Sequence, residues 1–232
     1  MLQSQLPIAN KLLAALPRWE YQRIAEHLES VKLTEGQVLS EPGEMLRYVY
    51  FPENCLLSFL TLVDTAEVFA VGLVGNEGMS SASSALGSPI STFRTLVQSS
   101  GQAQRIKVKV FVKEFRECVA LRDAVLAYVL SLTVQISQTA ACNRFHVIEE
   151  RLARWLLMMR DRLYSNHFHM THQMLGQLMG VRRVGVTNAA HALKLRNLID
   201  YSRGAIDIVD PQGLRKVACS CYQVIEGRHG NH

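Results

Sequence analysis

Two adjacent arginines, Arg182 and Arg183, are followed one helical turn later by Thr187 and Asn188. A guanidinium group can donate two parallel hydrogen bonds to O6 and N7 of guanine, and an asparagine amide can pair in the same way with adenine. Side chains of these types at the exposed start of a helix are typical of base recognition in the major groove. Their spacing therefore predicts a nucleic-acid interface here.

The residues around these side chains predict two helices joined by a tight turn, which is a helix-turn-helix. Gly180 would let the chain turn sharply between the helices. The apolar positions that would face inward keep helical spacing on both sides of the turn: Leu175, Leu178, Val186, Ala190 and Leu193. The second helix, about Arg182–Arg196, is then the recognition helix.

A β-hairpin is predicted directly after this second helix. Two apolar runs, 198–201 and 205–209, flank Ser202-Arg203-Gly204, so that Arg203 lies at the tip. Such a hairpin would form a wing beside the phosphate backbone. Asp210 as a cap and Pro211 at the first helical position then predict a last helix.

The charge of the chain is concentrated in the same region. The 232 residues carry a net charge of +5, but residues 1–143 hold 12 Lys and Arg against 13 Asp and Glu, whereas residues 144–232 hold 13 against 7. The first part is therefore −1 and the second +6, which favours a polyanionic partner for the second. A solvated basic face is the alternative that charge alone leaves open.

The sequence predicts a folded cytoplasmic protein. With 48% hydrophobic and 19% charged residues, it does not have the composition of a disordered chain. It has no run of about 18 uninterrupted apolar residues, and residues 1–20 show no secretory signal. We therefore expect no membrane association.

The cysteines and one cluster of histidines are residue types that can bind a metal ion. Five scattered cysteines indicate reduced thiols rather than a disulfide framework. Cys219 and Cys221 would lie in the last helix, where residues two apart do not both face one ion. His167, His169 and His172 have ligand-like spacing but precede the helix-turn-helix, where loop histidines or phosphate contacts are commoner. No metal site is assigned, and no role is assigned to either cluster.

The N-terminal half predicts a small antiparallel barrel or sandwich. Two short helices are expected within residues 3–30, and short β-rich runs separated by Gly, Pro and Asn turns follow up to Val110. Strict alternation over 105–110 predicts a half-buried strand that continues to Val110.

A long helix is predicted after Phe111. Its apolar positions Val125, Val129, Leu132 and Ile136 follow the 4-3-4 spacing of a coiled-coil seam, which favours a homodimer. The alternative is that this stripe packs against the same chain. A second helix is expected from His146 to about Leu163.

The chain resembles the cyclic-AMP receptor protein and fumarate-nitrate regulator (Crp/Fnr) family of bacterial transcription regulators over essentially its whole length. The most specific match runs from the helix-turn-helix into the wing: Thr171, Gln173, Leu175, Gly176, Gln177, Gly180, Arg183, Val186 and Asn197-Leu198-Ile199. The resemblance implies an α+β fold with an N-terminal cyclic-nucleotide-binding-like jelly roll, a long dimerisation helix and a C-terminal winged helix-turn-helix. The boundaries it implies are 1–116, 117–145 and 146–232.

The resemblance also implies a set of DNA-binding residues and partners. Arg183 takes the place of the family's guanine-reading arginine, whereas Val184 stands where members often carry a cytosine-reading glutamate, and Asn188 replaces a frequent arginine. The full set comprises Thr171, Gln173, Arg182, Arg183, Thr187, Asn188 and Arg203. The expected partners are a pseudo-palindromic double-stranded DNA operator, a second copy of the chain and RNA polymerase.

An effector pocket is implied in the barrel, at Glu77, Gly78, Ser91 and Arg94. Cyclic-nucleotide binders of the family place an arginine directly before the serine or threonine of this motif, but Ile90 precedes Ser91 here. A buried phosphodiester without its charge partner is strongly disfavoured. A cyclic nucleotide is therefore not supported by the motif, and no cofactor is identified. The family's iron-sulfur type also does not fit, since no cysteine precedes Cys55.

Three functions compete on these grounds. The first is a homodimeric, sequence-specific transcription regulator gated by an unidentified effector. A variant of this first function is a cyclic-nucleotide-responsive regulator. The second is a constitutive DNA-binding factor whose barrel binds a protein and no ligand. The third, an enzyme with a Cys or Ser nucleophile, lacks a nucleophile elbow, a phosphate loop or an HExxH motif, so we expect no enzymatic activity.

Overall fold

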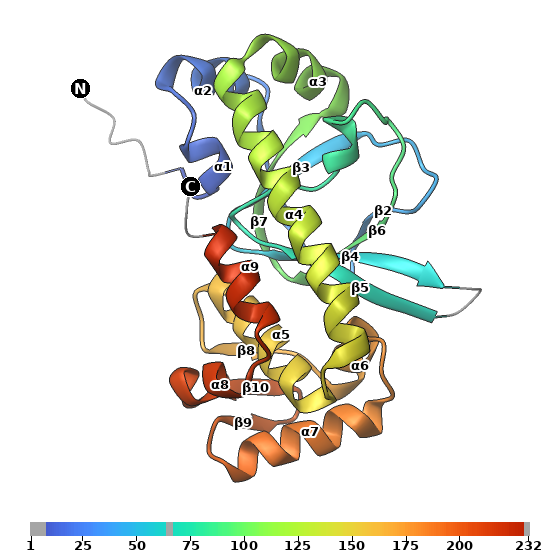
Figure 1. Ribbon diagram of the computed structural model, residues 1–232. Coiled ribbons are helices and arrows are strands. Elements are labelled where there is room, and N and C mark those ends of the chain that lie inside the picture. The colour runs from blue at the N-terminus through green and yellow to red at the C-terminus, as the bar shows by residue number, and fades with distance from the viewer. Residues whose placement is uncertain (1–7, 64–66, 230–232) are drawn as a thin grey trace. The chain divides into compact units, whose positions relative to one another are not determined.

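The computed structural model describes residues 8–63 and 67–229 (Figure 1). The chain divides into two compact units, Met1–Leu57 with Val74–Leu130 and Ser58–Leu73 with Ser131–His232. The predicted α+β fold class, with a sheet-rich N-terminal part and a C-terminal winged helix-turn-helix, is confirmed.

The first unit begins with two short helices and continues mainly as strands. Asn10 caps α1, and its side-chain amide also donates to the carbonyls of Pro52 and Gly78, both at 2.9 Å. The predicted pair of N-terminal helices is present, but the second ends at Ala25, because strand β1 begins at Glu29; residues 3–7 lie outside the described part. The elements up to the long helix are α1 Lys11–Ala14, α2 Arg18–Ala25, β1 Glu29–Leu33, β2 Val38–Ser40, β3 Tyr48–Pro52, β4 Leu56–Val63, β5 Glu67–Val74, the 3-10 turn η1 Ala82–Ser84, β6 Arg94–Ser99, β7 Gly101–Lys107 and α3 Val108–Glu117.

The strands form two sheets, with the orders β1-β7-β3 and β2-β6-β4-β5. The first sheet is antiparallel, with Val31 opposite Ala103 and Val49 opposite Ile106. Val49 and Phe51 of β3 are fully buried, whereas Tyr48 and Tyr50, which alternate with them along the strand, are only partly buried. This alternation is the pattern of a strand with one face in the core.

The predicted strand 105–110 ends earlier than expected. β7 stops at Lys107, where the register with β3 also ends, and Val108 begins helix α3. Val108, Phe111 and Glu114 are buried at the spacing of a helix. The end of the segment that alternates between apolar and basic residues therefore also fits a helical pattern. Without a partner strand beyond Lys107, the helix is the structure that buries them.

Helix α4, Val119–Phe145, is the predicted long helix. Both carboxylate oxygens of the buried Glu20 accept hydrogen bonds from backbone amides in its first turn, those of Ala120 at 3.1 Å and Leu121 at 2.9 Å. By length and composition this helix could cross a membrane. It is a core helix instead: one face is buried, and the Gln135 side chain is paired with the backbone of Leu73.

The second unit includes residues 58–73 and the second half of α4, and it also holds the remaining helices and one small sheet. The predicted helix 146–163 is confirmed as α5 Ile148–Leu163, with Leu152, Trp155, Leu156 and Met159 buried. A three-stranded antiparallel sheet has the order β8-β10-β9. The elements are β8 His167–His169, α6 His172–Met179, α7 Arg183–Leu195, β9 Ile199–Ser202, β10 Ala205–Ile208, α8 Pro211–Val217 and α9 Cys221–His229.

Candidate nucleic-acid interface

The turn between α6 and α7 is fixed at both ends by local hydrogen bonds and backbone conformation. The Thr171 hydroxyl caps α6 by accepting a hydrogen bond from the amide of Met174 at 3.2 Å. Gly180 ends the helix in the left-handed region, with φ of +61°. The stop lies at the glycine that the sequence predicts for the turn, and it sets where α7 begins.

Gly176 makes a second close approach that sets the geometry of the turn. The amide of Val181 donates to the carbonyl of Gly176 at 2.9 Å, and a Cβ on Gly176 would lie only 2.9 Å from the carbonyl oxygen of Val181. Any larger residue would force the two helices apart. The angle between α6 and α7 therefore depends on a glycine at this position.

Helix α7 presents one apolar and one polar face. Its buried residues are Val186, Ala189, Ala190 and Leu193. Arg182, Arg183 and Asn188 are exposed, as is Val184, whose side chain is 62% accessible. The first turn of the helix thus offers two guanidinium groups, an amide and one apolar side chain to solvent.

The wing is a tight hairpin in which β9 and β10 pair through Ser202 and Ala205. Its two central residues, Arg203 and Gly204, both have positive φ, +48° and +86°. Positive values at both positions define a type I′ turn, which matches the twist of the flanking strands. The exposed Arg203 is held at the tip, as the sequence predicts.

The basic side chains of this unit fall into two groups. Several pair with carboxylates: Lys194 with Asp200, Arg196 with Glu149 and Arg215 with Glu226. By contrast, the guanidinium groups of Arg182, Arg183 and Arg203 form no hydrogen bond or ion pair with any residue that the structure describes. These three exposed guanidinium groups lie at the start of α7 and at the wing tip.

A hollow of about 420 Å³ lies between the helix-turn-helix and the wing. It brings together four predicted site residues, Thr171, Gln173, Arg183 and Arg203, and is also lined by His172 and Tyr201. Asn188 instead lines a second hollow beside the start of α5, with Gly185 and Ile148 among its neighbours. The predicted residues thus divide between two sides of α7.

Two of the predicted contacts are already engaged within the chain. The Thr171 hydroxyl caps α6, and the Thr187 hydroxyl donates to the carbonyl of Arg183 at 3.1 Å. The Nδ1 atom of His172 lies 3.1 Å from that same Thr187 oxygen, and its ring meets Tyr201 edge-on at 4.8 Å. Burial, with the nearby charge of Arg183, lowers the pKa of His172 below its usual 6.5. Thr171, Thr187 and His172 therefore act mainly as supports.

The predicted effector residues are occupied by contacts inside the barrel. The Arg94 guanidinium lies 2.8 Å from a carboxylate oxygen of Glu41, and it alternates along β6 with the buried Thr95. The Ser91 hydroxyl donates to the carbonyl of Phe93 at 2.7 Å. The Glu77 carboxylate accepts from the amide of Gly75 at 3.0 Å.

Gly78, the fourth effector residue, lies directly under an aromatic ring. A Cβ at this position would lie 2.1 Å from the ring of Tyr128 on α4. The Tyr128 hydroxyl donates to the carbonyl of Met79 at 2.8 Å. Of the four residues, Arg94 alone is cationic. The carboxylate of Glu41 supplies the negative charge beside it that the phosphate of a ligand would otherwise supply.

The dimerisation residues split into two pairs. Val125 and Leu132 are buried within one chain, at 0% and 6% exposure, so the alternative that the stripe packs on its own chain holds for these two. Val129 and Ile136 are half-buried. Among the large apolar side chains that α4 leaves exposed, Leu126 and Leu130 lie in its middle, at 43% and 57%, and Val119 and Phe145 lie at its ends.

The histidine cluster is not brought together in the part of the chain that the structure describes. His167 pairs with Asp207 at 2.7 Å, whereas His172 contacts Thr187. The expectation for the cysteines is wrong in one respect: α8 ends at Val217 and α9 begins at Cys221, so Cys219 and Cys221 do not share a helix. Sequence reasoning did not connect them with Cys142 and His146, which approach from the end of α4.

Comparisons with known proteins match the helix-turn-helix region and extend to the whole fold. Residues 150–217 match the family model of the Crp-like helix-turn-helix domain. A transcriptional regulator of the Crp/Fnr family from Eubacterium rectale is 15% identical, with a TM-score of 0.68 over 87% of this chain and 94% of that one. FixK2 from Bradyrhizobium japonicum is 14% identical, with a TM-score of 0.69 over 83% and 98%.

A third similar structure is the c-di-GMP responsive global regulator CLP of Xanthomonas campestris, 13% identical, with a TM-score of 0.66 over 83% of this chain and 99% of that one. No curated protein matches the chain in sequence. The chain is thus built as a sheet-rich domain joined to a winged helix-turn-helix. More particularly, it has the fold of Crp/Fnr transcription regulators and carries a Crp-like DNA-binding domain, as the resemblance implies.

Proposed function

We propose that this protein is a homodimeric, sequence-specific transcription regulator of the cytoplasm. The observation that carries the proposal is that the exposed guanidinium groups of Arg182, Arg183 and Arg203, on the recognition helix and wing, have no partner among the described residues. Other exposed basic side chains of this unit, such as Arg196 and Arg215, pair with carboxylates. Phosphates and guanine edges are the partners that a free guanidinium fork fits best.

Base specificity would come mainly from Arg183 and its neighbour Val184. Arg183 is positioned to hold guanine, and the exposed Val184 offers an apolar contact suited to the methyl group of thymine. Arg203 would contact the phosphate backbone, since a wing lies beside the groove. The operator should therefore contain guanine at one conserved half-site position and thymine where a glutamate would have selected cytosine.

Selection of bound sequences from a random DNA pool tests this proposal directly. We expect a two-fold symmetric consensus whose half-sites are about one helical turn, roughly 34 Å, apart. Enrichment of a sequence without symmetry would contradict the homodimer. Retention of every sequence with equal affinity would contradict specific recognition.

Dimerisation is proposed to use the face of α4 that carries Leu126 and Leu130 together with the half-buried Val129 and Ile136. Leu130→Asp should weaken the dimer by about 100-fold or more, because each carboxylate would be buried opposite its symmetry copy. Sedimentation equilibrium measures this effect. Leu86→Asp, at an exposed position outside α4, is the matched control and should remain dimeric.

The role of the N-terminal domain, residues 1–116, is proposed to be effector sensing, with 117–145 as the dimerisation helix and 146–232 as the DNA-binding domain. An effector would shift the pairing of α4 and reorient the recognition helices. The alternative of a constitutive factor predicts operator affinity that no metabolite changes. Because Arg94 is paired with Glu41, both an unidentified effector and a constitutive factor are favoured over regulation by a cyclic nucleotide. RNA polymerase is the expected protein partner.

A further inference from the structure

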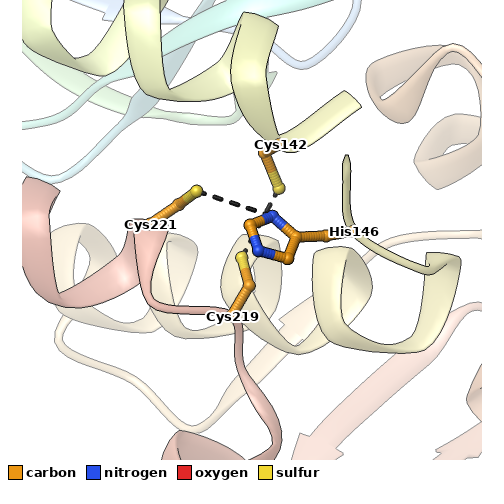
Figure 2. Close-up of side chains that lie close together, drawn as sticks. All are labelled: Cys142, His146, Cys219 and Cys221. Atoms are coloured by element: carbon orange, nitrogen blue, oxygen red, sulfur yellow. Dashed lines mark hydrogen bonds between the residues drawn. The ribbon is translucent and has the colours of Figure 1, made fainter. Parts of the chain in front are cut away.

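Four side chains that no DNA-binding role uses converge in the second unit. The potential ligand atoms of Cys142, His146, Cys219 and Cys221 all lie within 4.8 Å of one another (Figure 2). The Sγ atoms of Cys142 and Cys219 are 3.4 Å apart, and Sγ of Cys221 is 3.7 Å from Nδ1 of His146. All three cysteines are free thiols and buried.

Backbone structure explains why these residues meet. Cys142 and His146 are four residues apart, and the amide of His146 donates to the carbonyl of Cys142 at 3.1 Å, so both side chains lie on one face of the last turn of α4. Cys219 precedes α9 and Cys221 opens it. The amide of Tyr222 donates to the carbonyl of Cys219 at 3.0 Å, which forms a turn between them. Two sequence-distant segments thus supply two ligands each.

The number, type and spacing of these groups fit one metal ion. Three thiolates and one imidazole are a common ligand set of structural Zn²⁺ sites. A tetrahedron with Zn–S bonds of about 2.3 Å places neighbouring ligand atoms roughly 3.7 Å apart, close to the two observed distances of 3.4 and 3.7 Å. An iron-sulfur cluster spreads its cysteines around an inorganic core and so needs wider spacing.

A buried arginine beside the cluster supplies an independent reason for an anionic site. Arg154 is 0% exposed, and its Nε and Nη2 atoms have no hydrogen-bond partner among the described residues. Its Nη1 donates to the hydroxyl of Thr139 at 3.2 Å. The guanidinium lies close enough to act electrostatically on all three cysteines.

The charge balance of the site requires a partner for this cation. An unpaired buried charge is strongly destabilising, and three neutral thiols do not compensate it. Three thiolates around a divalent ion carry a net charge of −1, which offsets the charge of Arg154. Arg151 is a second buried cation near the cluster, and its Nη2 donates to Asn143 and to the carbonyl of Met179. The orphaned donors of Arg154 are therefore accounted for when the cluster holds a metal.

We propose that Cys142, His146, Cys219 and Cys221 bind one Zn²⁺ ion per chain. The ion would fasten the end of α4 to the segment between α8 and α9. Because the unfolded chain does not hold these four ligands together, the binding free energy of the ion would contribute to the folding free energy of this part of the second unit.

The full-length protein, purified under reducing conditions, provides the test. Elemental analysis should find zinc at about one ion per chain. After exchange with Co²⁺, the protein should show the visible absorption of tetrahedral cobalt and the near-ultraviolet bands of cobalt–thiolate bonds. These measurements use the unaltered chain, so they do not depend on how any variant folds.

Variants locate the site. Cys219→Ser and Cys142→Ser should lose most of the bound zinc, whereas Cys55→Ser and Cys118→Ser, which alter buried thiols of the first unit, should keep it. His146→Cys preserves four ligands and should retain zinc, with stronger cobalt–thiolate absorption. This conservative variant separates loss of a ligand from loss of the fold.

Several results would overturn the proposal. Protein that contains no zinc and binds neither added Zn²⁺ nor Co²⁺ in reducing buffer has no such site. Iron with acid-labile sulfide would replace the single ion by a cluster, and a Cys142–Cys219 disulfide that forms in place of metal binding would identify a redox pair. Equal loss of zinc in Cys55→Ser would place the ion elsewhere.

Discussion

The two predicted sites differ in how they use their arginines. In the first, the effector pocket of the barrel, Arg94 lies 2.8 Å from Glu41. In the second, Arg183 and Arg203 face solvent with their donors unused by described residues. Cations that are already paired mainly support the fold, whereas unpaired ones are available to a ligand. The difference indicates that the DNA-reading part is ready for its partner as folded, while the barrel offers no free cation at its predicted pocket.

Substitution of Arg183 should have the largest effect on DNA binding and so tests this difference between the two sites most strongly. Arg183→Ala should cost about 1–3 kcal/mol of operator binding, or roughly 5- to 150-fold in affinity, and should relax preference for guanine at one position. Fluorescence anisotropy with matched and mutated operators measures both effects. Arg215→Ala, which removes an arginine paired with Glu226, is the control and should change neither. An Arg183→Ala protein with unchanged affinity and preference would mean that the recognition helix is wrongly assigned.

A smaller and different effect is expected at the wing. Arg203→Ala should weaken binding to all sequences alike, because a phosphate contact carries no base information. The slope of log affinity against log salt should fall by about 1. Titrations of specific and random DNA at several salt concentrations measure it. If the loss were confined to the operator, Arg203 would be reading a base.

In the barrel, Arg94→Ala should leave DNA binding unchanged. The Arg94–Glu41 pair is about one-third exposed on each side, so its removal should cost no more than about 1 kcal/mol of stability. Thermal unfolding and anisotropy measure the two quantities. Calorimetry of the unaltered protein should detect no binding of cyclic AMP. Binding that Arg94→Ala abolishes would reverse the comparison, since Arg94 would then leave Glu41 for a ligand.

The smallest effect concerns pH. Because burial and the charge of Arg183 lower the pKa of His172 below 6.5 in the folded state, the unfolded chain binds that proton more readily. The free energy of unfolding should therefore fall slightly as pH drops below about 6.5, until the lowered folded pKa is passed. Denaturant unfolding of His172→Gln should lack this contribution, whereas His191→Gln, at an exposed site on α7, should retain it. An unchanged slope in His172→Gln would show that other groups cause it.

Local signals explain why the DNA-binding unit could be predicted well. The glycine stop at Gly180 and the Asp210-Pro211 start each act within a few residues, so the sequence itself contains their partners. The same holds for the hairpin that presents Arg203. Here the local preferences and the final fold agree.

Predictions that depended on distant partners were less accurate. The strand after Arg105 ends at Lys107 because β3 no longer pairs with it, and no pattern within 105–110 contains that fact. Val125 and Leu132 of the predicted seam are buried by their own chain, although spacing alone treats them like Val129 and Ile136. The four-residue cluster joins positions 142 and 221, and sequence spacing could not show that they meet.

The turn at the wing tip has a consequence for stability. Arg203 adopts φ of +48°, a left-handed conformation that costs a residue with a Cβ roughly 1 kcal/mol and that glycine, and to a lesser degree asparagine, adopts more readily. The chain thus accepts a conformational penalty at the position where it presents the exposed guanidinium of Arg203. Glycine or asparagine at residue 203 would give a more stable hairpin but a lower affinity for DNA. At this position, a substitution that increases stability therefore decreases binding.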